Sequence, residues 1–149
     1  MPSSFAVRAS GLSLNLLRIA TGFCHAQHGA QKLLGAFGGM GDSGGAAPFM
    51  SIFWIAGVME TIGGTLVALG LFTRPVAFLL SGEMAVAYFQ FHAPRGFWPI
   101  LNHGELPVLY TFIYLFLAAN GGGNLSLDGL FRRKPALPPP AAETPSQSS

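Results

Sequence analysis

The sequence has few charged residues. Lysine, arginine, aspartate and glutamate together make up 9% of its 149 residues, whereas half of the residues are hydrophobic. Soluble domains usually carry about a quarter charged residues, so this composition predicts a protein whose solvent is a lipid bilayer. The formal net charge is only +2. Because no dense basic face accompanies it, a nucleic-acid partner is not expected.

Cysteine is almost absent, and Cys24 is the only one in the sequence. An internal disulfide and a C-x-x-C redox pair are therefore excluded. The sequence also lacks the G-x-G-x-x-G dinucleotide motif, a phosphate-binding loop and a haem-attachment motif. If the protein takes part in redox chemistry, the electrons must move on a bound cofactor or on a partner protein.

Long apolar segments are abundant instead. Each is close to the roughly 20 residues that a helix needs to cross the hydrocarbon core of a bilayer. Glycine and proline residues separate them, as expected for turns between helices. The four segments are 11–34, 49–72, 75–93 and 102–120.

These segments predict an all-α fold, a four-helix transmembrane bundle. Residues 1–10 would form a cytoplasmic N-terminal segment and residues 11–131 the membrane domain. Residues 132–149 are rich in proline, alanine and serine, which predicts a disordered cytoplasmic tail.

The distribution of basic residues predicts the orientation. Lys32 and Arg95 would lie on one side of the bilayer. The positive-inside rule places the more basic side, and with it both termini, in the cytoplasm. Trp54 and Trp98 then fall at the outer interface, where aromatic residues are common. The more basic side holds Arg8, Arg74, Arg132, Arg133 and Lys134.

A polar stripe runs along the first segment. Its members are spaced three, four, three and four residues apart, which places them on one side of a helix. Lipid does not solvate such a stripe, so it should face the interior of the bundle or a watery cavity. An alternative is that these groups only pair with neighbouring helices. The stripe consists of Arg18, Thr21, His25, His28 and Lys32.

Two carboxylates are predicted in the middle of spans, Glu60 in the second and Glu83 in the third. A charge at the centre of a span is costly unless it is paired or neutral. We expect the long side chain of Arg18 to reach them, forming an intramembrane charge cluster. The alternative is a static structural ion pair, because buried pairs are weak evidence of catalysis.

A second group of polar residues is expected near the outer surface, where it would form a vestibule bordered by aromatic residues. Such a vestibule would suit a quinone head group, a small anion or a proton path. The N-H-G-E run at 102–105 also fits a capping box for the fourth helix. A metal ion is not expected, because a positive Lys32 lies close to the two histidines that precede it. The vestibule candidates are His25, His28, Lys32, His92, Asn102, His103 and Glu105.

Several runs resemble those of DoxX-like membrane proteins. The run H-G-A-Q-K-L at 28–33 is similar to the end of that family's first helix. E-T-I-G-G at 60–64 and L-G-L-F-T-R at 69–74 resemble its second helix. N-H-G-E at 102–105 and G-G-G-N-L-S-L-D at 121–128 resemble its fourth helix. The four motifs occur in the family's order, and the resemblance covers about residues 14–128.

The resemblance implies a four-helix, multi-pass protein of the bacterial inner membrane. The family takes its name from membrane subunits of a quinone-linked thiosulfate-oxidising enzyme. The functional positions that the resemblance implies are His28, Lys32, Glu60, Glu83, Asn102 and Glu105.

Two classes of function follow from these observations. The first is a redox-associated membrane subunit, rather than a stand-alone enzyme, that binds a quinone or a small sulfur compound at the outer vestibule. Its partners would be the lipid bilayer and a soluble redox protein. The second is a small proton or solute transporter, or a channel-like protein, that uses the charge cluster. A membrane assembly factor without catalytic activity is a further alternative.

Overall fold

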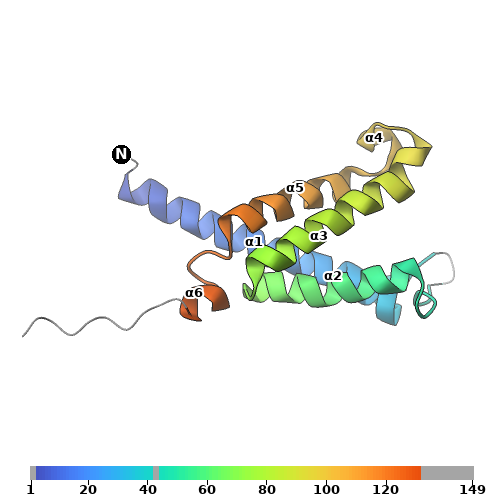
Figure 1. The fold of residues 1–149 in the computed structure, drawn as a ribbon, viewed down its shortest axis with the longest axis horizontal. Helices are drawn as coiled ribbons and strands as arrows, with labels where there is room; N and C mark the ends of the chain where they lie inside the picture. Colours follow the sequence, from blue (N-terminus) through green and yellow to red (C-terminus); the bar gives the residue numbers. More distant parts are fainter. Residues whose placement is uncertain (1–2, 42–43, 132–149) are drawn as a thin grey trace, which may run out of the picture.

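The computed structural model describes residues 3–41 and 44–131. Within these ranges the chain is helical, and an isolated β-bridge between Met40 and Gly45 is its only extended pairing. This confirms the predicted all-α fold. Four long helices form the body of the molecule (Figure 1), namely α1 Ser4–Leu34, α2 Ile52–Leu69, α3 Thr73–Ala87 and α5 Glu105–Asn120.

The long helices form two pairs. Helix α1 packs mainly against α2, and α3 packs mainly against α5. Successive long helices run in opposite directions, so the chain passes along the molecule four times (Figure 1). The N-terminus and α6 (Leu127–Phe131) lie at one end, which we call the α6 end. Residues 88–104, which include α4 (Pro99–Asn102), lie at the other end, which we call the α4 end.

Two longer connections, at 35–51 and 88–104, join the long helices at the α4 end. Helix α3 continues directly into a π-helix, Tyr88–His92, and a 3-10 turn, Ala93–Arg95. The helical path therefore ends close to the predicted end of the third segment. Another 3-10 turn, Ala36–Gly38, follows α1.

The start of α5 differs from the prediction. Asn102 is the last residue of α4, and His103 has a φ angle of 57°, which interrupts the helix. Gly104 is the residue before α5 and provides no side-chain cap. The predicted capping box at 102–105 is therefore not formed, because the left-handed turn at His103 separates its two halves.

Glycines allow α1 and α2 to pack closely. A side chain on Gly22 would collide with the main chain of Gly64 and Ala68, and a side chain on Gly64 would collide with the main chain of Gly22 and Ala26. Such contacts are typical of helices that associate within a membrane. They bring the polar stripe of α1 against the α2 face that carries Glu60.

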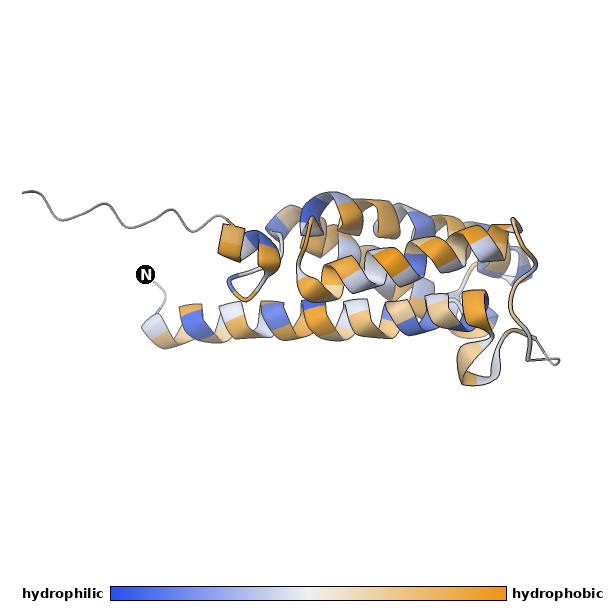
Figure 2. Ribbon diagram, turned by 90° about the horizontal axis from the view of Figure 1, so that it is seen from below, coloured by the Kyte–Doolittle hydropathy of each residue, from blue (hydrophilic) through white to orange (hydrophobic). Residues whose placement is uncertain are grey.

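Polar groups lie inside the molecule and large apolar groups lie outside. Arg18 and His25 are each 1% exposed and Glu60 is 3% exposed, whereas Phe23 is 60% and Phe112 is 65% exposed. Figure 2 shows the hydrophilic and hydrophobic residues that alternate along α1. This distribution is the reverse of that in a soluble domain.

Helix α2 is long and apolar enough to cross a membrane, and no other helix in the described ranges combines both properties. Helix α5 is apolar but has only 16 residues. By itself, one such helix is weak evidence for a membrane protein.

Candidate functional site

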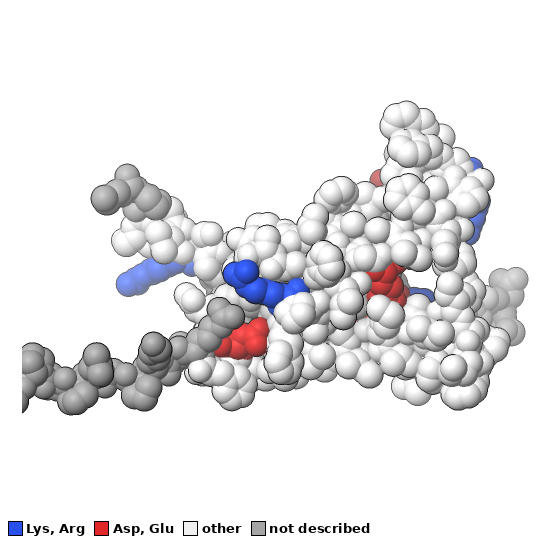
Figure 3. Space-filling view, in the orientation of Figure 1, with Lys and Arg blue, Asp and Glu red and all other residues white. Residues whose placement is uncertain are grey.

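A cavity of about 560 Å³ opens between the two helix pairs towards the α4 end. Binding sites for small molecules usually measure roughly 300–1,000 Å³. Figure 3 shows acidic atoms bordering a hollow on an otherwise mostly uncharged face. The apolar part of the lining includes Ile52, Phe53, Ile55, Ala56, Met59, Val86 and Phe91, and the polar part includes His25, His28, Lys32, Glu60, Glu83, Gln90 and His92.

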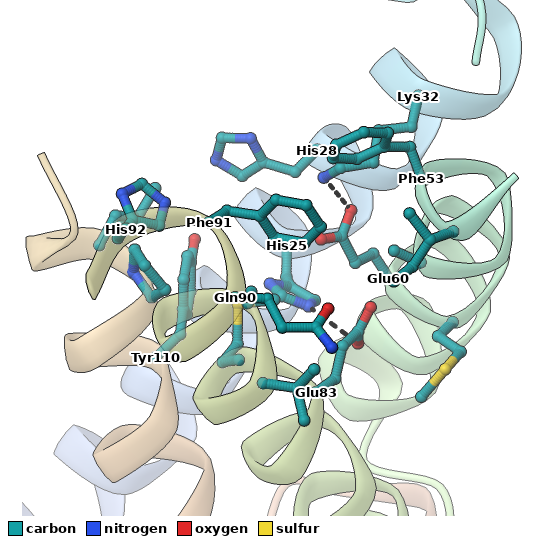
Figure 4. Close-up of a pocket in the computed structure, with 18 of the residues that line it drawn as sticks. His25, His28, Lys32, Phe53, Glu60, Glu83, Gln90, Phe91, His92 and Tyr110 are labelled. Atoms are coloured by element: carbon teal, nitrogen blue, oxygen red, sulfur yellow. Dashed lines mark hydrogen bonds and ion pairs between the residues drawn. The ribbon is translucent and has the colours of Figure 1, made fainter. Parts of the chain in front are cut away.

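The cavity unites residues that the sequence placed in two separate groups. His25, His28 and Lys32 belong to the predicted vestibule, whereas Glu60 and Glu83 belong to the predicted charge cluster. All five line the same space (Figure 4). Glu60 and Glu83 therefore belong to the same cavity as the three vestibule residues and do not form a separate site.

Lys32 and Glu60 form an ion pair across the α1–α2 contact. The Lys32 Nζ atom donates a hydrogen bond of 2.5 Å to Glu60 Oε2. The Glu60 side chain is 4% exposed and the Lys32 side chain is 19% exposed. The ammonium group thus neutralises one of the two carboxylates that line the cavity.

His25 and Glu83 face each other without a hydrogen bond. The His25 Nε2 and Glu83 Oε2 atoms are 4.0 Å apart, and the two side chains are 1% and 8% exposed. Among the described residues, neither imidazole nitrogen and neither carboxylate oxygen has a hydrogen-bond partner. Leaving a buried polar group unpaired costs about 1–3 kcal/mol. These atoms are therefore the ones in the cavity most in need of a partner.

Two tyrosines of α5 fix the orientation of the His25 ring. The ring makes edge contacts with Tyr110 and Tyr114, at centroid distances of 4.9 and 5.1 Å. The tyrosine rings stack on each other at 5.8 Å. Neither tyrosine is among the site residues predicted from the sequence. Their spacing of four residues within a charge-free segment places both on one side of a helix, and this spacing is the sequence feature that could have indicated them.

The hairpin at the α4 end is organised by Asn102, which is buried. Its amide nitrogen donates to the Gly96 carbonyl at 2.5 Å, and its side-chain oxygen accepts from the Gly104 N–H at 2.7 Å. Its own carbonyl oxygen lies 3.1 Å from His92 Nδ1. Asn102 therefore holds the hairpin and His92 in place, and it does not line the cavity.

The remaining vestibule candidates divide in the same way. His92 lines the cavity, and Arg95 joins it there. His103 and Glu105 are exposed and lie outside the lining. Four of the seven predicted vestibule residues, His25, His28, Lys32 and His92, thus line one space.

Arg18 is not joined to Glu60 or Glu83, so the predicted cluster of these three residues is not formed. Its guanidinium donates to the Val67 carbonyl at 2.7 Å, to the Ala68 carbonyl, and to the Leu125 carbonyl at 2.8 Å. The last carbonyls of a helix have no donor within the helix and carry partial negative charge. Arg18 therefore donates to main-chain carbonyls at the end of α2, and not to the carboxylates of Glu60 and Glu83 as predicted.

The segment 121–128 closes the α6 end around Arg18. The Leu125 N–H donates to the side-chain oxygen of Asn15 at 3.2 Å. The Asp128 carboxylate accepts from the N–H groups of Phe72 and Thr73, at 2.9 Å each. Asp128 thereby caps α3 from far along the chain. The G-G-G-N-L-S-L-D motif has a structural role here, and a second cavity of about 440 Å³ lies beside it.

Ligands for a metal ion do not converge in the part of the chain that the structure describes, where no group of three histidine, cysteine, aspartate or glutamate side chains has suitable positions. An organic ligand fits the lining better. It would meet both apolar side chains and hydrogen-bonding groups in the cavity.

The fold and the site define a class of protein: an all-helical protein with a largely apolar cavity between two helix pairs that also carries buried ionisable side chains. The DoxX family model matches residues 13–93, more than half of the chain. The chain belongs to the DoxX family, which is membrane-associated. This confirms the family resemblance and supports a membrane location.

Two relatives come from Haemophilus influenzae, and both are described as uncharacterized proteins. One is 40% identical over 131 residues, which cover 81% of this chain and 92% of the relative. The other is 35% identical over 74 residues, covering 50% of this chain and 49% of the relative. No solved structure matches the chain.

Proposed function

We propose that the protein is a multi-pass protein of the bacterial inner membrane in which all four long helices span the bilayer. The exposed apolar side chains and the buried polar side chains support this placement. Helix α1 has 31 residues, and α3 with its π-helix continues to His92. At a rise of 1.5 Å per residue, about 20 residues cover the roughly 30 Å of hydrocarbon.

Both termini would face the cytoplasm. Arg8 and Arg74 belong to the α6 end, whereas Lys32 and Arg95 belong to the α4 end. Glu60 neutralises Lys32, which leaves the α4 end with less positive charge. The basic residues Arg132, Arg133 and Lys134 and the predicted tail lie outside the described residues. The positive-inside rule favours a cytoplasmic α6 end and an outward-facing α4 end.

The cavity would bind an amphiphilic ring compound of the quinone class, and the protein would act as the membrane subunit of a redox system. One observation carries this proposal: a cavity of about 560 Å³ whose lining combines polar side chains, from α1 and from Glu60 and Glu83, with apolar and aromatic side chains of α2 and the π-helix. A quinone has both a polar ring and an apolar tail. Phe53 and Phe91 offer flat surfaces for the ring, and their own rings lie 5.0 Å apart.

The charge inside the cavity favours a neutral ligand over a small sulfur oxyanion. Lys32 is already paired with Glu60, and Glu83 adds a second carboxyl group. Arg95 is exposed at the rim. An anion in the interior would therefore meet two carboxyl groups and a single ammonium group that is engaged elsewhere. We place the quinone ahead of the sulfur compound for this reason.

A transport role has less support than binding. A proton or solute path would have to connect the cavity with the polar groups around Arg18 at the α6 end. Between them lies the core of the bundle, where Val67, Leu80, Tyr114 and Leu117 are at most 2% exposed. These packed side chains separate the cavity from the region around Arg18, so a binding site is the simpler function.

The test is to fill the cavity and measure quinone binding. The full-length protein, purified in detergent, would be titrated with a benzoquinone that carries a decyl chain. Ala56→Leu adds bulk to the lining, and Ala119→Leu makes the same change at an exposed position of α5 outside the cavity. We expect Ala56→Leu to weaken binding at least about tenfold, because overpacking usually costs 1–3 kcal/mol. Ala119→Leu should bind as the wild type does.

Absence of binding to the wild-type protein would refute the proposal. Equal affinities of the two variants would show that the quinone binds somewhere else. A soluble redox protein that copurifies with the wild-type chain would identify the electron-transfer partner.

A further inference from the structure

The closest unpaired polar groups in the cavity lie between α1 and α3. Figure 4 shows His25 and Glu83 approaching each other across the cavity, with their ion-pair distance of 4.0 Å marked. Both side chains are more than nine-tenths buried. Their four polar atoms have no hydrogen-bond partner among the described residues. The gap between them is therefore a place where a ligand atom would satisfy two groups at once.

The gap has the size of a single bridging oxygen. Hydrogen bonds that involve an O–H group are usually about 2.7–2.8 Å long. An oxygen at this distance from both His25 Nε2 and Glu83 Oε2 would see them at an angle of roughly 90°. This is close to the angle between the donor and acceptor directions of a hydroxyl group. A larger group would have to push α1 and α3 apart.

The chemistry of the two groups selects a hydroxyl. A ligand hydroxyl donates to one partner and accepts from the other, as an imidazole next to a carboxyl requires. A carbonyl oxygen only accepts, and an ammonium group only donates. A carboxylate offers acceptors alone, so an ether or a carbonyl would leave Glu83 unpaired.

We propose that the gap between His25 and Glu83 is a subsite for a ligand hydroxyl group and that the cavity therefore prefers a quinol to the corresponding quinone. This inference rests on the proposed function, because it assumes that a ring compound of the quinone class enters the cavity. Tyr110 supports the geometry from behind, since its ring packs edge-on against His25. Lys32 and Glu60 satisfy each other and need no ligand.

A water molecule in the gap would bind the same two atoms, His25 Nε2 and Glu83 Oε2, in the empty protein. A ligand hydroxyl that displaces such a water must reproduce its hydrogen bonds, and a group that does not do so loses affinity. The selectivity therefore arises from what the ligand does at this gap, whereas the apolar wall contributes equally to every ligand of the same shape.

The experiment compares three ligands that share the same ring and tail. The decyl benzoquinone, its quinol and the dimethyl ether of the quinol would each be titrated anaerobically into the full-length protein in detergent. The ether keeps the ring and the tail but removes both donors. We expect the quinol to bind about tenfold to a hundredfold more tightly than the ether and the quinone, which corresponds to one to two hydrogen bonds with a charged group.

Two variants locate the selectivity. Glu83→Met keeps the length of the side chain but removes its acceptors, and the preference for the quinol should fall to about twofold or less. Glu105→Met makes the same change at an exposed carboxylate outside the cavity and should keep the full preference. Unchanged quinone binding by Glu83→Met would show that the variant is folded. If it does not fold, Glu83→Gln, which keeps one acceptor, should show an intermediate preference.

The possible failures are distinct. If none of the three ligands binds, the proposed function is wrong. If all three bind with equal affinity, the quinone site stands and the hydroxyl subsite is overturned. A preference that survives in Glu83→Met overturns the subsite as well, because another group would then be recognising the hydroxyl.

Discussion

Each end of the molecule combines a buried basic side chain with a carboxyl group, but the two ends differ in the hydrogen bonds that these groups make. At the α6 end, the terminal nitrogens of Arg18 donate to three main-chain carbonyls, and Asp128 accepts from two N–H groups. Towards the α4 end, His25 and Glu83 have no hydrogen bond in the described residues. The first arrangement joins helices, whereas the second leaves hydrogen-bonding capacity facing a cavity.

Whether a buried polar residue has a hydrogen-bond partner distinguishes a structural residue from a candidate binding residue better than its burial or its charge does. Arg18 and His25 lie on the same stripe of α1 and are equally buried, at 1% exposure each. A buried polar group that the fold itself satisfies is explained by folding. A buried polar group that borders a cavity and has no partner needs another explanation, and a ligand provides one. The Lys32–Glu60 pair lies between these extremes, because it is satisfied and still lines the cavity.

The largest effect should come from removing Arg18. Arg18→Ala would leave the carbonyls of Ala68 and Leu125 without this donor and would remove one of the two donors to the Val67 carbonyl, which also accepts from the Gly70 N–H. We expect a loss of at least about 3 kcal/mol of unfolding free energy, since hydrogen bonds to a charged group contribute about 1.5–3 kcal/mol each. Thermal unfolding in detergent would measure it, with Arg8→Ala, which changes an exposed arginine of the same helix, as the control. Equal melting of the two variants would contradict the structural role of Arg18.

An intermediate effect is expected at the ion pair. Lys32→Met and Glu60→Met would each leave an unpaired charge, and each should cost about 2 kcal/mol, less than a fully buried pair because Lys32 is partly exposed. The double variant should cost less than either single one, because replacing both members with apolar residues is often neutral. A double-mutant cycle would measure this coupling. Additive losses would show that the two residues act independently.

The main features of the fold could be predicted because hydrophobic periodicity and turn residues are local signals. The apolar segment 49–72 contains α2, the segment 75–93 contains α3 except for its first two residues, and the glycine after α2 ends that helix in the left-handed conformation. The start of α5 could not be predicted in the same way. Asn102 looks like a helix cap in sequence, but it makes its hydrogen bonds within a hairpin with Gly96 and Gly104.

The candidate site could be predicted in composition but not in connectivity. Helical spacing correctly placed His25, His28 and Lys32 on one interior stripe. It could not show which carboxylate each cation meets, because that depends on how far α2 is shifted along α1. Arg18 meets the end of α2, and Lys32 therefore meets Glu60, about two turns earlier in that helix. The spacing of residues within one helix does not reveal how far α2 is shifted along α1.

The smallest effect on stability is expected at Glu83. This variant is the most direct test of the difference between the α4 end and the α6 end. A carboxyl group without a partner contributes little to the folded state, so Glu83→Met should change the unfolding free energy by less than about 0.5 kcal/mol or raise it. Arg18→Ala serves as the contrast in the same thermal assay. A loss of more than about 2 kcal/mol in Glu83→Met would mean that the fold already satisfies this carboxyl group. The polar groups at the α4 end would then be satisfied by the fold, like those at the α6 end. The main evidence that the cavity binds a ligand would be removed.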